Sequence, residues 1–161
     1  MRSYVTSYNA LFARRAPDAP VVQSIEIPLI QRDYAQGREG GVVERIRTSF
    51  LNVLYDAVTG GERVSLDFVY GDVENGTLRP LDGQQRLTSL TLLMMLLKQL
   101  QKSLPESEQV NIDELIYSEQ YGVKSFNLDI DERKQCMEAL FEGAAFDVSD
   151  KSESVQNLVQ R

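Results

Sequence analysis

The sequence predicts a single α/β domain in which helices pack on a small mixed β-sheet. Several short segments alternate apolar and polar residues, as strands do, and longer segments place apolar residues at helical spacing. The chain has 161 residues, of which 42% are hydrophobic and 25% charged, so it can bury a substantial core. These three observations are typical of one globular domain.

The composition excludes several classes of site. The sequence contains no histidine, which removes Ser-His-Asp, Cys-His and His-ligated zinc chemistry. Cys136 is the single cysteine, so no intrachain disulfide can form, and we expect a reducing, cytoplasmic location. The apolar run at residues 92–97 is too short to span a bilayer, so no membrane partner is expected. A net charge of −7 argues against a basic surface overall, but it leaves room for a local basic groove.

The first third of the chain predicts an arm, a strand and a helix. Residues 1–20 form an arm whose helically spaced apolar residues can dock on the core: Tyr4, Tyr8, Leu11 and Phe12. Residues 21–27 alternate and predict a strand, with Ile25 and Ile27 on one side. Residues 42–58 form an amphipathic helix that two glycines end, and its apolar stripe is Val43, Ile46, Phe50, Val53, Leu54 and Ala57.

The middle of the chain predicts a hairpin followed by a buried helix. Residues 64–70 alternate cleanly and predict a strand, and Asn75-Gly76 is a turn signal before a return strand at 77–81. Pro80 cannot donate to a ladder, so this return strand should lie at an edge or end there. Residues 87–101 are apolar on nearly every side, so we expect a helix buried on several sides.

The last third predicts a strand and two helices. Residues 125–130 alternate, and Asp129 or Asp131 can cap a helix at about residues 132–141. Residues 149–161 begin another helix, which we interpret as the start of a truncated helical extension. Residues 21–148 are then the main domain.

A polar motif, Asp82-Gly83-Gln84-Gln85-Arg86, lies where the return strand meets the apolar helix. The first backbone N–H groups of a helix have no intrahelical partners, and the helix dipole favours an anion there. Gly83 lets a ligand approach the backbone closely, and Arg86 can grip a phosphate with two donors.

The other polar side chains of this stretch have matching roles. The amides of Gln84 and Gln85 can position phosphates or a water, and Thr88 offers a hydroxyl one turn into the helix. Asp82 can hold a divalent cation or orient a water, but it can equally be a helix N-cap. A second polar cluster, Gln31, Arg32 and Tyr34, follows the first predicted strand.

Together these motifs resemble the N-terminal domain of the GmrSD-type restriction endonucleases. The matching residues are Pro28, Gln31, Arg32 and Tyr34, then Gly71, then the stretch 81–90 that contains Asp82-Gly83-Gln84-Gln85-Arg86. The resemblance covers about residues 25–100 and is weaker over 126–141. Gln36 stands where the family usually has an aromatic residue, and Ser89 stands for a usual threonine.

The resemblance implies a ParB/sulfiredoxin-like fold and a nucleotide-binding function in bacterial defence against phage. It implies that the domain binds and hydrolyses an NTP with Mg²⁺. It also implies that the domain regulates DNA cleavage by a separate or C-terminal nuclease domain, which in some systems cuts modified DNA. Arg86 and the backbone from Gly83 would hold phosphates, and Asp82 would be the metal ligand. Gln31 and Arg32 would close the pocket from the opposite loop, and Tyr34 would pack on a base or sugar. DNA would be contacted through the full-length protein, and a homo-oligomer is left open.

Two other functions remain open from the sequence. A ParB-like DNA-binding or nuclease domain is the first, because basic residues crowd the first third of the chain: Arg2, Arg14, Arg15, Arg32, Arg38, Arg45 and Arg47. The second is a non-catalytic scaffold that docks a nuclease partner. A steep salt dependence of DNA binding would favour the former, and nucleotide that binds without turnover would favour the latter.

Overall fold

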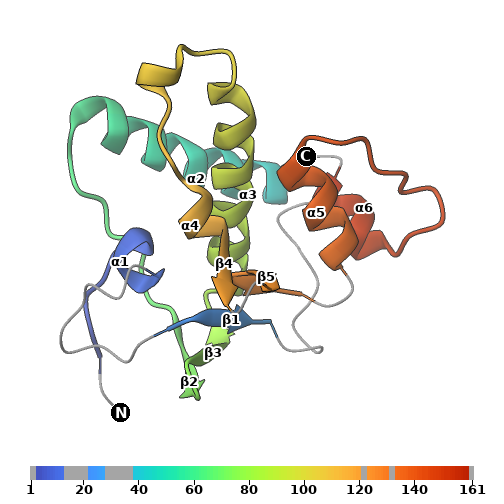
Figure 1. Ribbon diagram of the computed structural model, residues 1–161. Helices are drawn as coiled ribbons and strands as arrows, with labels where there is room; N and C mark the ends of the chain where they lie inside the picture. The colour runs from blue at the N-terminus through green and yellow to red at the C-terminus, as the bar shows by residue number, and fades with distance from the viewer. Residues whose placement is uncertain (1–2, 13–21, 28–37, 121–122, 131–132, 160–161) are drawn as a thin grey trace.

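The computed structural model describes residues 3–12, 22–27, 38–120, 123–130 and 133–159. Its strands are β1 (Ser24–Glu26), β2 (Tyr70–Glu74), β3 (Thr77–Asp82), β4 (Tyr117–Gln120), β5 (Val123–Phe126) and β6 (Leu128–Asp129). Its helices are α1 (Tyr8–Phe12), α2 (Gly41–Gly60), α3 (Gln84–Gln101), α4 (Asp113–Ile116), α5 (Lys134–Glu142) and α6 (Glu153–Val159), with a 3₁₀ turn at Glu106–Glu108. Helices lie above a small sheet in Figure 1, which confirms the predicted α/β class.

The main sheet of the described residues is mixed and has the strand order β2-β3-β1-β6. Strands β2 and β3 are antiparallel, as the Asn-Gly turn predicts, whereas β1 runs parallel to both β3 and β6. Ile25 pairs with Leu78 on one side and with Leu128 on the other. All three side chains are buried, so this row forms the inner face of the sheet.

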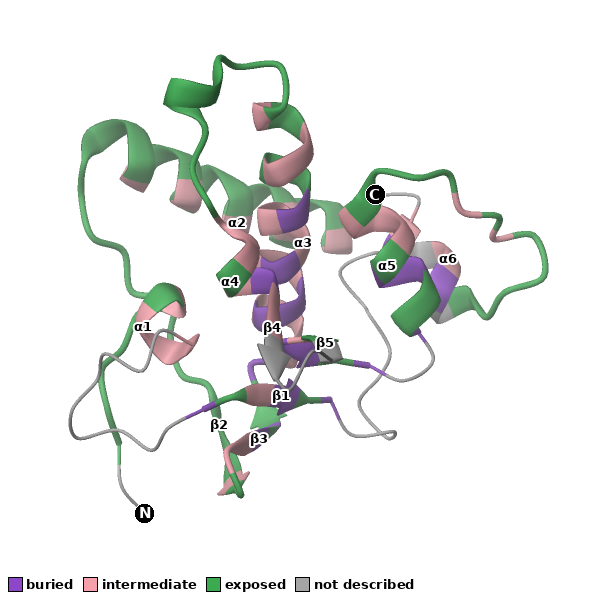
Figure 2. Ribbon diagram, viewed as in Figure 1, coloured by how far each residue is buried: buried purple, intermediate pink, exposed green. Residues whose placement is uncertain are grey.

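Among the described residues, two hydrophobic clusters form the core. The first joins the sheet to the start of α3 and contains Val22, Ile25, Ile27, Leu78, Leu87, Leu128 and Ile130. The second joins α3 to the helices that follow it and contains Met95, Ile116, Cys136, Met137, Val155 and Leu158. Helix α3 contributes to both, and its buried residues form a band in Figure 2. The candidate motif is therefore attached to the element that links the two clusters.

Both ends of the described chain pack on these clusters. Tyr8, Leu11 and Phe12 of α1 pack against the first cluster, as predicted, whereas Tyr4 is 40% exposed. The Tyr8 hydroxyl lies 2.8 Å from the hydroxyl of Thr91 on α3, which ties the arm to the central helix. Val155 and Leu158 of α6 are buried in the second cluster, so this helix covers part of the core.

The strand predicted at residues 64–70 is wrong for all but its last residue. Residues 62–69 have no regular secondary structure, and Asp67 has a left-handed φ of +68°. The pairing between β2 and β3 begins at Tyr70, which lies opposite Asp82. Upstream of Tyr70, the carbonyls of Leu66 and Phe68 accept hydrogen bonds from the Arg86 side chain instead of from a strand. An alternating pattern specifies a strand only where a neighbouring strand is present to complete the ladder.

The prediction that Pro80 marks an edge or ending strand is wrong for β3 as a whole, although the pairing with β1 does end before Pro80. Strand β3 lies between β2 and β1 and continues to Asp82. Pairing with β1 involves Thr77 and Leu78, upstream of Pro80, and at Pro80 itself the paired neighbour is Gly71 of β2. The missing N–H of Pro80 therefore lies beyond the β1 ladder.

Helix α3 is buried along one stripe and not on several sides. Its buried residues are Leu87, Thr88, Thr91 and Met95, whereas Leu96, Leu97 and Leu100 are 54%, 43% and 58% exposed. The fully buried residues lie on one side of the helix, and Leu96, Leu97 and Leu100 face outward. None of the described helices is both long enough and apolar enough to cross a membrane.

The predicted cap of α5 lies elsewhere. Helix α5 begins at Lys134, its N-cap is Arg133, and no side chain among the described residues caps it. Asp129 belongs to β6, whose ladder with β1 fixes its backbone in an extended form, and Asp131 lies outside the described residues. Gly143, in a left-handed conformation, ends α5 as predicted.

We expect the domain to lose stability above pH 9. Burial raises the pKa of the Cys136 thiol to about 11, from 9.0 for an exposed thiol. The folded state then holds the proton more tightly, so the contribution is complete below pH 9 and is lost as the pH rises through 11. At pH 10.5 the loss is about 2 kcal/mol. Urea melts at pH 7.5 and 10.5 measure it.

A Cys136→Ala variant should show a smaller fall between these two pH values than the parent, whatever its stability at pH 7.5. Burial also raises the pKa of Tyr8, to about 12, so Tyr8→Phe should leave most of the fall to pH 10.5 in place. An equal fall in the parent and in Cys136→Ala would contradict the assignment.

Candidate functional site

The polar motif forms a tight turn between β3 and α3. Gly83 is the N-cap of α3, with φ +90°, and the first helical hydrogen bond runs from the Leu87 N–H to the Gly83 carbonyl at 3.1 Å. A Cβ atom on Gly83 would lie 2.7 Å from Cγ2 of Val69 and 3.1 Å from its Cα. Positive φ and close packing together require glycine here.

The Asp82 carboxylate accepts a hydrogen bond of 2.7 Å from the Gly83 N–H. Asp82 immediately precedes the N-cap residue, Gly83, so the alternative that Asp82 is itself the N-cap is wrong. Among the described residues no side chain caps the first turn of α3. The N–H groups of residues 84–86 therefore point out of the helix end beside an exposed carboxylate.

Arg86 holds the irregular segment at residues 62–69. Its Nη1 donates to the Leu66 carbonyl in a short hydrogen bond, and its Nη2 donates to the Phe68 carbonyl at 2.5 Å. The Asp67 carboxylate lies 3.8 Å from Nη1, and the Arg86 side chain is 20% exposed. Sequence reasoning missed this role, because backbone carbonyl acceptors leave no mark on residue identity.

The remaining motif side chains divide between the surface and the core. Gln84 donates from Nε2 to the Leu81 carbonyl at 3.3 Å, and both Gln84 and Gln85 are half-buried. Thr88 is 3% exposed and lies on the core side of α3. Gln31, Arg32 and Tyr34 lie outside the described residues.

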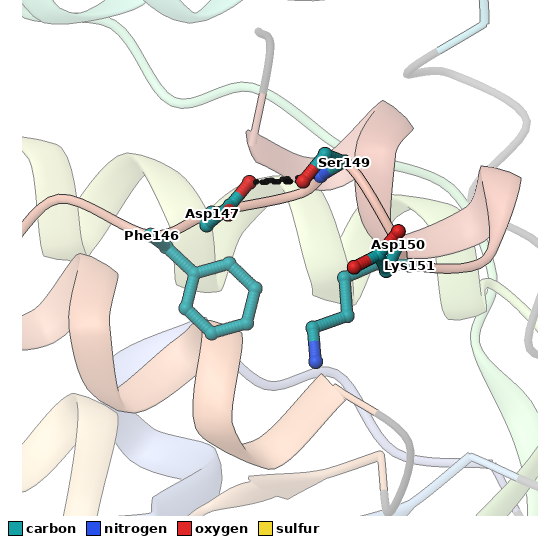
Figure 3. Close-up of a pocket in the computed structure, with 5 residues that line it drawn as sticks. All are labelled: Phe146, Asp147, Ser149, Asp150 and Lys151. Carbon is teal, nitrogen blue, oxygen red and sulfur yellow. Dashed lines mark hydrogen bonds between the residues drawn. The ribbon is translucent and has the colours of Figure 1, made fainter.

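Other regions of the described chain offer weaker sites. No group of three or more Cys, Asp or Glu residues there could hold a metal ion. A hollow of about 290 Å³ lies at Phe146, Asp147, Ser149, Asp150 and Lys151 (Figure 3). Asp147 accepts hydrogen bonds from the Ser149 hydroxyl and N–H at 2.7 and 3.0 Å, which lowers the pKa of its carboxyl. This arrangement is a local turn, and its two carboxylates would repel a phosphate.

A second hollow, of about 460 Å³, lies between α1 and α4 and contains none of the predicted site residues. Its lining includes the carboxylates of Asp113 and Glu114. The Lys98 ammonium pairs with Asp113 and also lies 4.3 Å from the Phe141 ring centre. The motif at the start of α3 is thus the better candidate for an anion.

Comparison with protein families gives a match over nearly the whole chain. The sequence model of the GmrSD restriction endonuclease N-terminal domain matches residues 12–160. The chain belongs to this family. Comparison with curated proteins gave no match. The family description of a GmrSD N-terminal domain implies an associated nuclease domain. The family match also extends beyond residues 25–100, where the sequence motifs lie, and includes α6.

Proposed function

We propose that this GmrSD N-terminal domain binds a nucleoside triphosphate with Mg²⁺ at the start of α3, hydrolyses it, and thereby regulates DNA cleavage by the associated nuclease domain. One observation supports this most strongly. The turn presents the first backbone amides of a helix next to an exposed carboxylate, without a side-chain cap from the described residues. Such a helix start binds phosphate oxygens through its amides and its dipole.

The proposed roles follow from where each side chain lies. Gln84 and Gln85 position the phosphates or the attacking water from the first turn. Arg86 has five N–H donors, of which two hold the carbonyls of Leu66 and Phe68, and the guanidinium charge adds to the attraction for phosphate. Thr88 is left out of the proposal because its side chain is buried in the core.

Asp82 fits an Mg²⁺ ion. It is an exposed carboxylate with one hydrogen bond to a backbone amide, and Mg²⁺ is commonly held by one or two carboxylates together with waters and substrate phosphates. When bound, the ion would neutralise phosphate charge. Gln31, Arg32 and Tyr34 enter the proposal through the family motif alone, as the opposite wall of the site.

The test is an Asp82→Asn variant assayed for nucleotide binding and phosphate release. Thermal-shift measurements with ATP, GTP, CTP and UTP, each with and without Mg²⁺, identify the nucleotide, since a ligand of the folded state raises the melting temperature. We expect Asp82→Asn to keep its fold and to lose turnover by about 100-fold.

Asp72→Asn is the matched control, because Asp72 is an exposed acid on β2. It should leave both binding and turnover unchanged. If Asp82→Asn binds and hydrolyses the nucleotide like the parent, the site assignment is wrong.

A second candidate function is a scaffold that docks the nuclease domain. Exposed apolar side chains on the described part of the chain favour it: Val42, Ile46 and Val58 on α2, and Leu96, Leu97 and Leu100 on α3. Nucleotide that binds but is never hydrolysed would support this function over the first. The described residues give less support to direct DNA binding. Glu39, Glu44 and Glu62 lie among the arginines of residues 38–63, so these arginines do not make a purely basic stretch.

A further inference from the structure

We infer that Phe68 stacks on the base of the nucleotide, which makes the segment at residues 62–69 part of the nucleotide site. This inference rests on the proposed function. The Phe68 ring is 75% exposed, although a phenyl ring has no polar group that benefits from water. Neighbouring apolar residues are exposed too. Val69 and Tyr70, which follow Phe68 in the chain, are 40% and 45% exposed, and Leu81 near the end of β3 is 59% exposed.

The backbone of Phe68 lies against the first turn of α3. Its carbonyl oxygen accepts the hydrogen bond from Arg86 Nη2 at 2.5 Å. The same oxygen lies 3.2 Å from the position that a Cβ on Gly83 would occupy, and Val69 packs on Gly83 directly. Phe68 is therefore carried by backbone that two independent contacts fix beside the proposed phosphate site.

Strand pairing brings a second aromatic residue to the same place. Tyr70 pairs with Asp82, so its Cα lies across the ladder from the proposed metal ligand. Two exposed aromatic residues thus flank the turn, both preceding or beginning β2. One face of a base can stack on an aromatic ring, and such contacts tolerate any base because each has a π-face.

The chemistry of Phe68 indicates stacking without base selection. A phenyl ring offers no hydrogen bond to a base edge, so it cannot read base identity by donors and acceptors. The inferred ligand is therefore a nucleoside triphosphate whose base stacks on Phe68 without being selected by it.

The experiment compares Phe68→Ala and Phe68→Trp with the parent chain by isothermal titration, using Mg²⁺ with ATP, GTP or inorganic tripolyphosphate. Phe68→Ala should weaken ATP and GTP by about 10-fold or more and leave tripolyphosphate unchanged. Phe68→Trp should restore nucleotide binding. Tyr55→Ala removes another exposed aromatic, 68% exposed on α2, and should change nothing.

The outcomes separate this inference from the proposed function. If the parent binds ATP or GTP and Phe68→Ala binds it equally well, the inference is wrong and the nucleotide site stands. If Phe68→Ala weakens tripolyphosphate as much as nucleotide, the ring supports the turn and not the base, which also overturns the inference. A parent chain that binds neither nucleotide nor tripolyphosphate overturns both.

Discussion

Replacing Gly71 by alanine should lower the free energy of unfolding by about 3 kcal/mol. A Cβ atom at this position would lie 2.2 Å from the Arg79 carbonyl oxygen and 2.7 Å from the Pro80 Cα. Both atoms belong to the backbone of β3, so no side-chain rotation can relieve the clash, and the two strands must separate at the bulge between Tyr70 and Gly71. Urea denaturation measures the loss, which corresponds to a fall of about 10 °C in Tm.

Gly41→Ala is the control for this substitution. Gly41 is the first residue of α2, and nothing lies within 4 Å of the position of its Cβ. Alanine favours helix over glycine, so this variant should be unchanged or more stable by up to about 1 kcal/mol. Equal stability of Gly71→Ala and Gly41→Ala would show that the β2–β3 pair accommodates the extra methyl group.

Arg86→Ala should lower the free energy of unfolding by about 3 kcal/mol and release the segment at residues 62–69. Hydrogen bonds from a charged donor contribute about 1.5–3 kcal/mol each, and Arg86 makes two to the carbonyls of Leu66 and Phe68. Urea denaturation measures the loss. Trypsin reports the release, because Arg63 lies within the segment and should be cleaved faster in the variant.

Two further variants define the cause. Arg86→Lys keeps the charge but loses the forked geometry that reaches two carbonyls, so it should recover less than half of the loss. Arg79→Ala removes an arginine whose ion pairs with Glu26 and Glu74 are exposed and screened by solvent, so its urea midpoint should stay close to that of the parent. A stable Arg86→Ala variant with unchanged cleavage at Arg63 would refute the anchoring role.

Local patterns in the sequence predicted much of the fold. The stripe in residues 42–58 predicted α2, and the Asn-Gly pair predicted the hairpin, because both patterns are set by short-range geometry. The exposure of the leucines in α3 and the irregular backbone at 62–69 were not predictable in this way. Both depend on which distant elements pack nearby, and that information is not contained in periodicity.

In the candidate site, too, the features set by local sequence were predicted and those set by distant contacts were not. Residue types at the strand-to-helix turn predicted an anion site at Asp82 to Arg86, and the structure places Gly83 at the N-cap, where the sequence had offered Asp82. The use of Arg86 to hold Leu66 and Phe68 was missed, since its acceptors are main-chain carbonyls. Burial of Thr88 was equally invisible, because a threonine one turn into a helix can face either way.

Helix α2 has a consequence for how the domain opens. None of its 20 residues is buried, and its half-buried positions form one narrow stripe of Val43, Arg47, Phe50, Leu54 and Ala57. Helices owe most of their stability to packing, so α2 should behave as a separate unit that unfolds locally at low free energy. Its amide hydrogens should exchange with solvent well before those of α3, and a docked partner would slow them.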